Sequence, residues 1–151
     1  MIELKFQLTI NRPLDEVFEY VSDMENLPQW GGGVIGAKRV TNGPIGVGTV
    51  FRLTAKPPVG PVAYSDYEYT EYERNRKYTA VGEVGPIPFT ETWVFDSIPT
   101  GVSIHIQMWL KPGGFLKLLQ PFLGLMFGVW IRSDFSKLKR VLEAKHAAQP
   151  A

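Results

Sequence analysis

The sequence contains no cysteine and only two histidines among its 151 residues. Disulfides, thiolate catalysis and cysteine-based zinc sites are therefore excluded, and His105 and His146 lack the spacing of a metal-ligand pair. Lys and Arg total 16 and Asp and Glu total 15, so the formal net charge is only +1. Because no overall charge excess exists, nothing in the composition favours nucleic acid as a partner. We predict neither a metal site nor a nucleic-acid interface.

Phosphate-binding loops, dinucleotide fingerprints and nucleophile elbows are also missing from the sequence, so no cofactor is predicted. The first ten residues alternate between apolar and polar side chains, unlike the continuous apolar run of a signal peptide. The apolar run from Leu118 to Ile131 is shorter than the ~20 residues that a spanning helix needs, and Gly and Pro interrupt it. These absences predict a cytoplasmic protein with no stable membrane insertion.

The most prominent feature of the sequence is a long apolar segment near the C-terminus, Gly114 to Ala144. It is predicted to form a helix from about Phe115 to Lys145, with Pro121 in its first turns or at a kink. Its first half is apolar nearly all round, so protein, a bound apolar ligand or lipid must surround that half. Its second half carries one apolar stripe, at i, i+4, i+8, i+11 and i+15: Phe127, Ile131, Phe135, Leu138 and Leu142.

Most of the remaining chain alternates between apolar and polar residues and is broken by Gly, Pro and Asn turns, which is typical of strands. The exception is Pro13 to Trp30, where Pro13 and Asp23 suit the starts of two short helices. Gly31-Gly32-Gly33 then predicts a turn. The predicted strands are Ile2–Ile10, Val34–Thr41, Thr49–Lys56, Tyr64–Glu73, Lys77–Val84, Phe89–Asp96 and Val102–Leu110.

Short connections between successive strands predict antiparallel pairing. The predicted class is therefore α+β: a seven-stranded antiparallel sheet wrapped around a long C-terminal helix, with two short helices after the first strand. At this length the chain is most simply one domain, 1–146, followed by a flexible tail, 147–151.

Several segments, taken in order, resemble a known superfamily. They are TINRPLDEVFEYVSDMENLPQW (Thr9 to Trp30), GPIGVGTVFR (Gly43 to Arg52), EYTEYERNRKYTA (Glu68 to Ala80) and the helix end DFSKLKRVLE. Together they resemble the SRPBCC superfamily, related to START and birch-pollen-allergen folds, and more narrowly its polyketide cyclase/dehydrase group. The resemblance implies a helix-grip fold with a deep apolar cavity between sheet and helix. It does not imply one reaction, because members include aromatase/cyclases and lipid and hormone binders.

Alternation predicts which residues would line such a cavity, since every second residue of a strand faces the helix. The lining is aromatic and contains methionine, as in small-molecule sites, and the alternative is a filled core of the same residues. Two proline-rich segments, Pro57 to Pro61 and Gly85 to Pro88, are expected at the cavity mouth. The predicted ligand-binding residues are Trp30, Tyr67, Tyr69, Tyr78, Phe89, Glu91, Trp93, Ile106, Met108, Leu119, Phe122 and Met126.

Glu91 is the unusual member of this set, because it lies between Phe89 and Trp93 on the inner face of its strand. A carboxylate facing an apolar cavity loses hydration, which raises its pKa into the range useful for acid–base catalysis. We therefore take Glu91 and Tyr67 as candidate catalytic residues, with Tyr67, Tyr69 and Tyr78 as the candidate hydrogen-bond partners of the carboxylate. The alternative is that Glu91 lies at a wet rim, or that a one-residue bulge turns it outward.

Three functions are compatible with these features. The favoured one is binding, or transport, of a hydrophobic small molecule such as a lipid, a polyketide or an aromatic compound. The second is a cyclase/dehydrase-like enzyme whose cavity Tyr and Glu groups transfer protons. The third is an interaction protein whose apolar helix half, or the outward-facing Trp109, forms a homodimer.

Overall fold

The computed structural model describes residues 1–56 and 61–148. All seven predicted strands are present, with ends within two residues of the prediction. The elements are β1 (Ile2–Ile10), α1 (Leu14–Ser22), the 3-10 helix η1 (Met24–Gln29), β2 (Val34–Arg39), β3 (Val50–Ala55), β4 (Ala63–Glu73), β5 (Lys77–Val84), β6 (Ile87–Ile98), β7 (Gly101–Leu110), the 3-10 helix η2 (Gly114–Leu119) and α2 (Gln120–Ala148).

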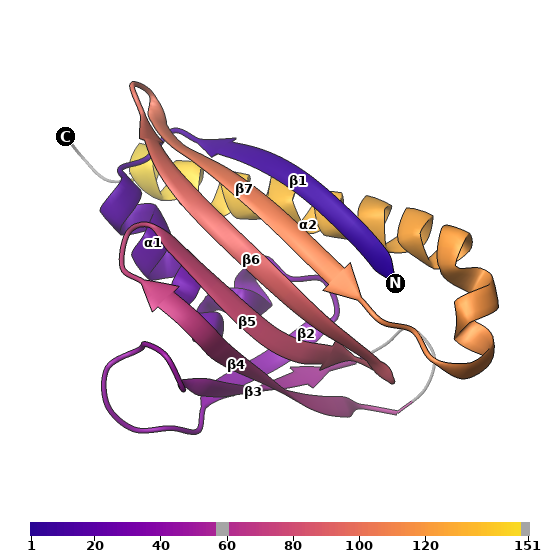
Figure 1. The fold of residues 1–151 in the computed structure, drawn as a ribbon. Helices are drawn as coiled ribbons and strands as arrows, with labels where there is room; N and C mark the ends of the chain where they lie inside the picture. The colour runs from indigo at the N-terminus through magenta and orange to yellow at the C-terminus, as the bar shows by residue number, and fades with distance from the viewer. Residues whose placement is uncertain (57–60, 149–151) are drawn as a thin grey trace.

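The strands form one antiparallel sheet in the order β1-β7-β6-β5-β4-β3-β2. Five of the six neighbouring pairs join strands that are consecutive in the sequence. The sixth pair joins the first strand, β1, to the last, β7, with Ile2 opposite Leu110 and Ile10 opposite Val102. In Figure 1 this sheet curves over α2, which runs behind it. The predicted helix-grip architecture is confirmed.

The two short helices follow β1 as predicted. α1 begins directly after Pro13, whose missing N–H costs nothing there, and Asp15 and Glu16 lie in its first turn, where the helix dipole favours anions. The Asp23 side chain accepts a hydrogen bond of 3.0 Å from the backbone N–H of Glu25 and so caps η1. These helices cover one end of the sheet.

The glycine turn after η1 connects the far edge of the sheet to α2. Gly33 has a φ of +81°, a conformation that favours glycine. The backbone N–H of Gly32 donates a hydrogen bond of 2.9 Å to the Asp134 carboxylate, in the second half of α2. A Cβ on Gly32 would lie 3.0 Å from that same carboxylate oxygen, so a small residue is required for this contact.

α2 lies along β1 on the inner side of the sheet, and its second half enters the core (Figure 1). Leu138 and Leu142 are fully buried, and the Phe135 ring lies 5.3 Å from the rings of both Phe6 and Trp93. Pro121 is the second residue of α2, where its missing N–H breaks no helical bond, as predicted. The helix continues to Ala148, two residues into the predicted tail; residues 149–151 lie outside the described residues.

The first half of α2 and the preceding η2 are far more exposed than the sequence prediction of a surrounded helix required. Leu123 and Phe127 are buried, but most of the other apolar side chains there face solvent. By length and composition alone, the helical region Gly114–Ala144 could cross a membrane, since its most apolar 18 residues have a mean hydropathy of 1.5. The sequence prediction, which counted only the run from Leu118 to Ile131, therefore underestimated the length of the apolar segment. Crossing a membrane with this apolar segment would remove Leu123 and Phe127 from the buried cluster that they form with Ile2 and Leu110.

Candidate functional site

Exposure changes steadily along the inner face of the sheet. In β4, Tyr69 is buried, Ser65 is partly exposed and Ala63 is exposed; in β6, Trp93 is buried and Glu91 is partly exposed. Alternation places all these residues on the side that α2 covers. The inner face is therefore closed where α1 and the second half of α2 cover it, and open where β4 begins.

Glu91 lies at the boundary between the closed and open parts, and it faces inward as the alternation predicted. Its carboxylate accepts a hydrogen bond from the Tyr67 hydroxyl, although β4 and β6 are not neighbours in the sheet. The intervening strand, β5, presents only Ala80 and Gly82 to the inner face at this level. Because these two side chains are small, the tyrosine ring can reach across β5 to the carboxylate.

Burial raises the pKa of Glu91 from 4.5 to about 7, because the charged carboxylate loses hydration. The hydrogen bond from Tyr67 and the nearby Trp93 indole N–H act in the opposite direction and limit the rise. Burial, followed by the charge of Glu91, raises the pKa of Tyr67 well above 10, so the tyrosine keeps its proton. Near neutral pH, Glu91 is therefore the group of this pair that exchanges a proton with its surroundings.

Two further polar groups lie beside the pair. The Tyr78 hydroxyl and the Trp93 indole N–H are buried there, the indole N–H beside the Glu91 carboxylate and the Tyr78 hydroxyl beside Tyr67. Tyr78 and Trp93 lie opposite each other on β5 and β6, with their rings stacked 5.7 Å apart. Four polar side chains, Tyr67, Tyr78, Glu91 and Trp93, thus gather within an aromatic part of the inner face.

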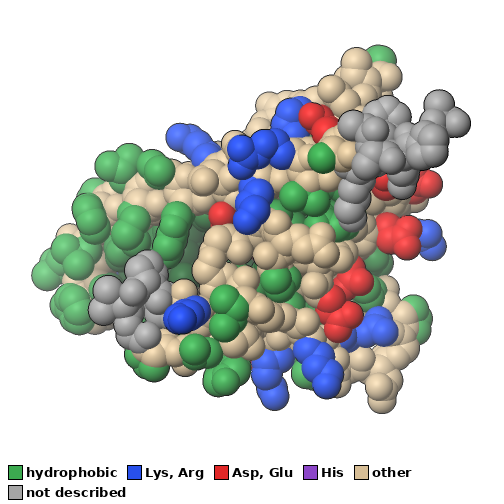
Figure 2. All heavy atoms as spheres, turned by 180° about the vertical axis from the view of Figure 1, so that it is seen from behind, with side chains coloured by type: hydrophobic (Ala, Val, Ile, Leu, Met, Phe, Trp, Pro, Cys, Tyr) green, Lys and Arg blue, Asp and Glu red, His purple; other side chains and the backbone are tan. Residues whose placement is uncertain are grey.

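A hollow lies on the surface beside the apolar first half of α2 (Figure 2). Two buried apolar clusters, one around Phe135 and one around Leu123 and Phe127, meet at Phe89 and Ile131. Figure 2 shows a hollow between the apolar first half of α2 and the body of the protein. Glu91 is partly exposed although Tyr67 and Trp93 beside it are buried, so the inner face begins to open to solvent at Glu91.

The structure separates the twelve predicted ligand-binding residues into three groups. Seven are buried: Trp30, Tyr67, Tyr69, Tyr78, Trp93, Ile106 and Met108. Phe89 and Glu91 are partly exposed on the inner face, and Leu119, Phe122 and Met126 are exposed. The last three were expected to close the cavity and do not, because η2 and the first half of α2 are buried only along the Leu123–Phe127 stripe.

Two other expectations are altered by the tertiary contacts. The Tyr69 hydroxyl donates a hydrogen bond to the backbone carbonyl of Ser22 and so joins β4 to the end of α1. This hydroxyl therefore stabilises the fold. Ile87 was expected in a turn at the cavity mouth, but it is the first residue of β6 and is buried in the cluster around Leu123 and Phe127. The other segment expected there, Pro57 to Pro61, falls largely outside the described residues.

Sequence reasoning missed three residues of the open inner face. Leu53 of β3 lies opposite Ser65 of β4, and both are partly exposed. Gly82 of β5 lies opposite Phe89, and a Cβ there would approach the Phe89 ring to 2.9 Å. The alternation that identified Tyr67 also includes Ser65 and Leu53, so the same signal, extended by one strand, would have found two of them.

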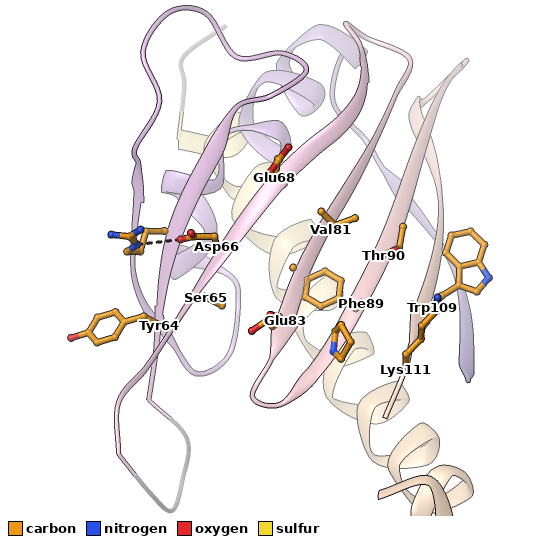
Figure 3. A pocket seen from close by; sticks show the side chains of 13 residues that line it. Tyr64, Ser65, Asp66, Glu68, Val81, Glu83, Phe89, Thr90, Trp109 and Lys111 are labelled. Carbon is orange, nitrogen blue, oxygen red and sulfur yellow. Dashed lines mark hydrogen bonds and ion pairs between the residues drawn. The ribbon is translucent and has the colours of Figure 1, made fainter. Parts of the chain in front are cut away.

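A separate groove of about 670 Å³ lies on the opposite face of the sheet (Figure 3). Its lining is largely charged or polar, and the Arg52 guanidinium donates a 3.1 Å hydrogen bond to Asp66 within it. In Figure 3, Tyr64 and Trp109 stand at its two sides and α2 lies behind the sheet. Trp109 and His105 thus lie on the outer face, as predicted. This open, charged groove is less suited to an apolar ligand than the inner face.

Solved structures share the fold at low sequence identity. StfQ, a di-domain ARO/CYC from the steffimycin biosynthetic pathway, matches with a TM-score of 0.78 and 12% identity over 97% of this chain and 52% of that one. The chain therefore spans about half the length of StfQ. TTHA0849 from Thermus thermophilus matches with a TM-score of 0.76 and 20% identity over 94% and 98% of the two chains. SA2116 from Staphylococcus aureus, a protein of unknown function, matches with a TM-score of 0.76 and 12% identity over 97% of this chain and 96% of that one.

These likenesses show the fold alone. No curated protein has a sequence that matches this chain. A family model described as "Polyketide cyclase / dehydrase and lipid transport" matches residues 1–143, which confirms the group predicted from the sequence. The chain belongs to the polyketide cyclase/dehydrase and lipid transport family.

Proposed function

We propose that the protein binds a hydrophobic small molecule, such as a lipid, a polyketide or an aromatic compound, against the open inner face of the sheet, in the cytoplasm. The observation that carries this proposal is the Glu91–Tyr67 pair within an otherwise apolar and aromatic face. Ligand sites typically combine an apolar lining with a few polar groups that orient the ligand. The family membership supports a ligand-binding or cyclase role.

Glu91 is the group proposed to meet the polar part of the ligand. With a pKa of about 7 it donates a hydrogen bond when protonated and accepts one when ionised. Tyr67, which is buried, holds the carboxylate in place and acts as a positioning residue. A suitable ligand therefore has a large apolar body and a carbonyl or hydroxyl group.

A second candidate, a cyclase/dehydrase-like enzyme, is favoured specifically by the raised pKa of Glu91. A carboxylate with a pKa near 7 can take a proton and return it at neutral pH. In a dehydration, ionised Glu91 would remove a proton from the carbon next to a carbonyl. It would then return that proton to the departing hydroxyl, so that water leaves and the carboxylate is regenerated.

Titration with a fluorescent probe that has an apolar body and a carbonyl group tests the binding proposal. We expect wild-type affinity to change between about pH 5 and 8, because Glu91 titrates in that range, and Glu91→Gln to remove this dependence. Glu83→Gln, an exposed glutamate of β5, is the matched control and should retain it. Native mass spectrometry would also measure the mass of any ligand that the purified protein retains. If the probe does not bind the wild type, or if its pH profile survives in Glu91→Gln, the proposal is wrong.

A further inference from the structure

We infer that the exposed apolar surface at the start of the C-terminal helical region docks the protein onto a lipid bilayer that carries anionic headgroups. This docking surface consists of Phe115, Leu118, Phe122, Leu125, Val129 and Trp130. The inference goes beyond the proposed binding function and does not depend on it, since the surface is present whether or not the hollow holds a ligand.

The docking surface is larger than a soluble protein ordinarily exposes. Leu118 is 84% exposed, Leu125 69% and Phe122 64%. With about 200 Å² for a full aromatic side chain, Phe115, Phe122 and Trp130 together expose roughly 370 Å². The three aliphatic members add to this, which brings the total to or above the ~300–600 Å² of the largest apolar patch on a typical monomer. Figure 2 shows these apolar side chains gathered at one end of the molecule.

The geometry of α2 indicates how this surface would meet a bilayer. Phe122, Leu125 and Val129 follow i, i+3, i+7 spacing on one side of the helix, while Leu123 and Phe127 bury another side against Ile2 and Leu110. The helix is thus anchored along one stripe and presents a second, apolar stripe to solvent. Because its C-terminal half is held in the core, the helix would lie in the interfacial plane of the membrane instead of crossing it.

The charges around the docking surface select the kind of membrane. From residue 111 to residue 133 the charged side chains are Lys111, Lys117 and Arg132, all positive and all exposed. The start of β1 lies beside this segment, because the Met1 backbone nitrogen donates a 3.0 Å hydrogen bond to the Gln120 side chain. Since the whole chain carries only +1, this cluster is a local feature. Basic side chains beside an interfacial apolar helix are attracted to anionic headgroups.

The same charges make a second copy of the chain a poorer occupant. In a two-fold dimer through this surface, Lys117 and Arg132 of both copies would be brought together, and no acidic side chain between residues 111 and 133 would offset the repulsion. A bilayer with anionic lipid satisfies both the apolar surface and the positive charges.

Vesicle flotation with the full chain tests the inference. We expect the wild type to float with phosphatidylcholine vesicles that contain phosphatidylglycerol, and to be released as salt is raised. The double variant Leu118→Glu, Leu125→Glu should lower the bound fraction at least about tenfold, because charged side chains are costly in the interface. Val47→Glu places the same change on an exposed valine of the loop between β2 and β3, and it should bind as the wild type does.

A second variant separates the electrostatic contribution from the apolar one. Lys111→Ala with Lys117→Ala should weaken binding to anionic vesicles about fivefold for each lysine, while binding to pure phosphatidylcholine stays unchanged. Circular dichroism should show that every variant is folded, since all the altered side chains are exposed. The inference is overturned if the wild type floats with neither kind of vesicle, or if Leu118→Glu, Leu125→Glu floats like the wild type. It is also overturned if the wild type is a dimer that this variant converts to a monomer while neither binds vesicles.

Discussion

Replacing Glu91 with glutamine should make the protein more stable at alkaline pH and flatten its pH dependence. Glutamine keeps the shape of the side chain and an oxygen that can accept from Tyr67, but it removes the titrating proton. In the folded wild type the pKa of Glu91 is about 7, against 4.5 for the unperturbed group. Between these two values the folded protein holds a proton that the unfolded chain has released.

The sign and size of the effect follow from this difference. Because the folded state binds the proton more tightly, the contribution of Glu91 to stability is greatest below pH 4.5 and falls as pH rises toward 7. The 2.5-unit difference between 7 and 4.5 corresponds to about 3 kcal/mol. This is an upper value, since part of Glu91 is exposed. At pH 8, Glu91→Gln should therefore gain up to about 3 kcal/mol, or roughly 6–12 °C in Tm.

Urea unfolding between pH 4 and 8, followed by tryptophan fluorescence, measures this gain. Asp134, whose pKa burial raises, and Glu143, whose pKa the hydrogen bond from Asn11 lowers, titrate equally in both proteins and cancel in the comparison. Glu83→Gln is the control, because this side chain is exposed on the outer face. If Glu91→Gln follows the wild type at every pH, the carboxylate is hydrated and the reasoning for the site fails.

Three further changes test the surroundings of the site. Tyr67→Phe removes a donor that favours ionised Glu91, so the pKa of Glu91 should rise above 7, as followed by carboxyl NMR. Phe135→Ala should cost about 3–5 kcal/mol in urea unfolding, because its buried ring contacts several aromatic side chains of the core. Gly82→Ala should cost about 1–3 kcal/mol and change probe affinity, because its Cβ would stand 2.9 Å from the Phe89 ring.

Each of these changes can fail in a recognisable way. A pKa of Glu91 that stays the same or falls in Tyr67→Phe would mean that the hydrogen bond does not stabilise the carboxylate. A loss below about 1 kcal/mol in Phe135→Ala would contradict its place in the core. For Gly82→Ala the control is Gly36→Ala in β2, where the nearest atom to a Cβ is 3.7 Å away. Equal losses in these two glycine variants would show that contact with Phe89 is not the cause.

The sequence alone determined the strands, the short helices and the direction in which Glu91 faces. These features are local: the two-residue period of a strand, the turn residues between strands and the Pro and Asp residues at helix starts act over a few positions. Glu91 lies between Phe89 and Trp93 in that period, so its inward direction followed without any tertiary information.

The pairing of Glu91 with Tyr67 was predicted only as one choice among three tyrosines, because it depends on what lies between the two strands. Ala80 and Gly82 leave room across β5, and this is visible only once the strand register is known. The pKa of about 7 likewise reflects burial produced by the whole inner face.

The apolar half of the C-terminal helix marks the limit of sequence reasoning. Composition required that protein, ligand or lipid cover it, and it could not choose among them. The choice depends on where α2 lies: it runs along β1, buries the stripe of Leu123 and Phe127, and leaves Leu118 and Leu125 in solvent. Apolar side chains at helical spacing give the same sequence pattern whether they face a sheet or water. Only the tertiary position of the helix therefore decides which stripe is buried in the core and which is exposed.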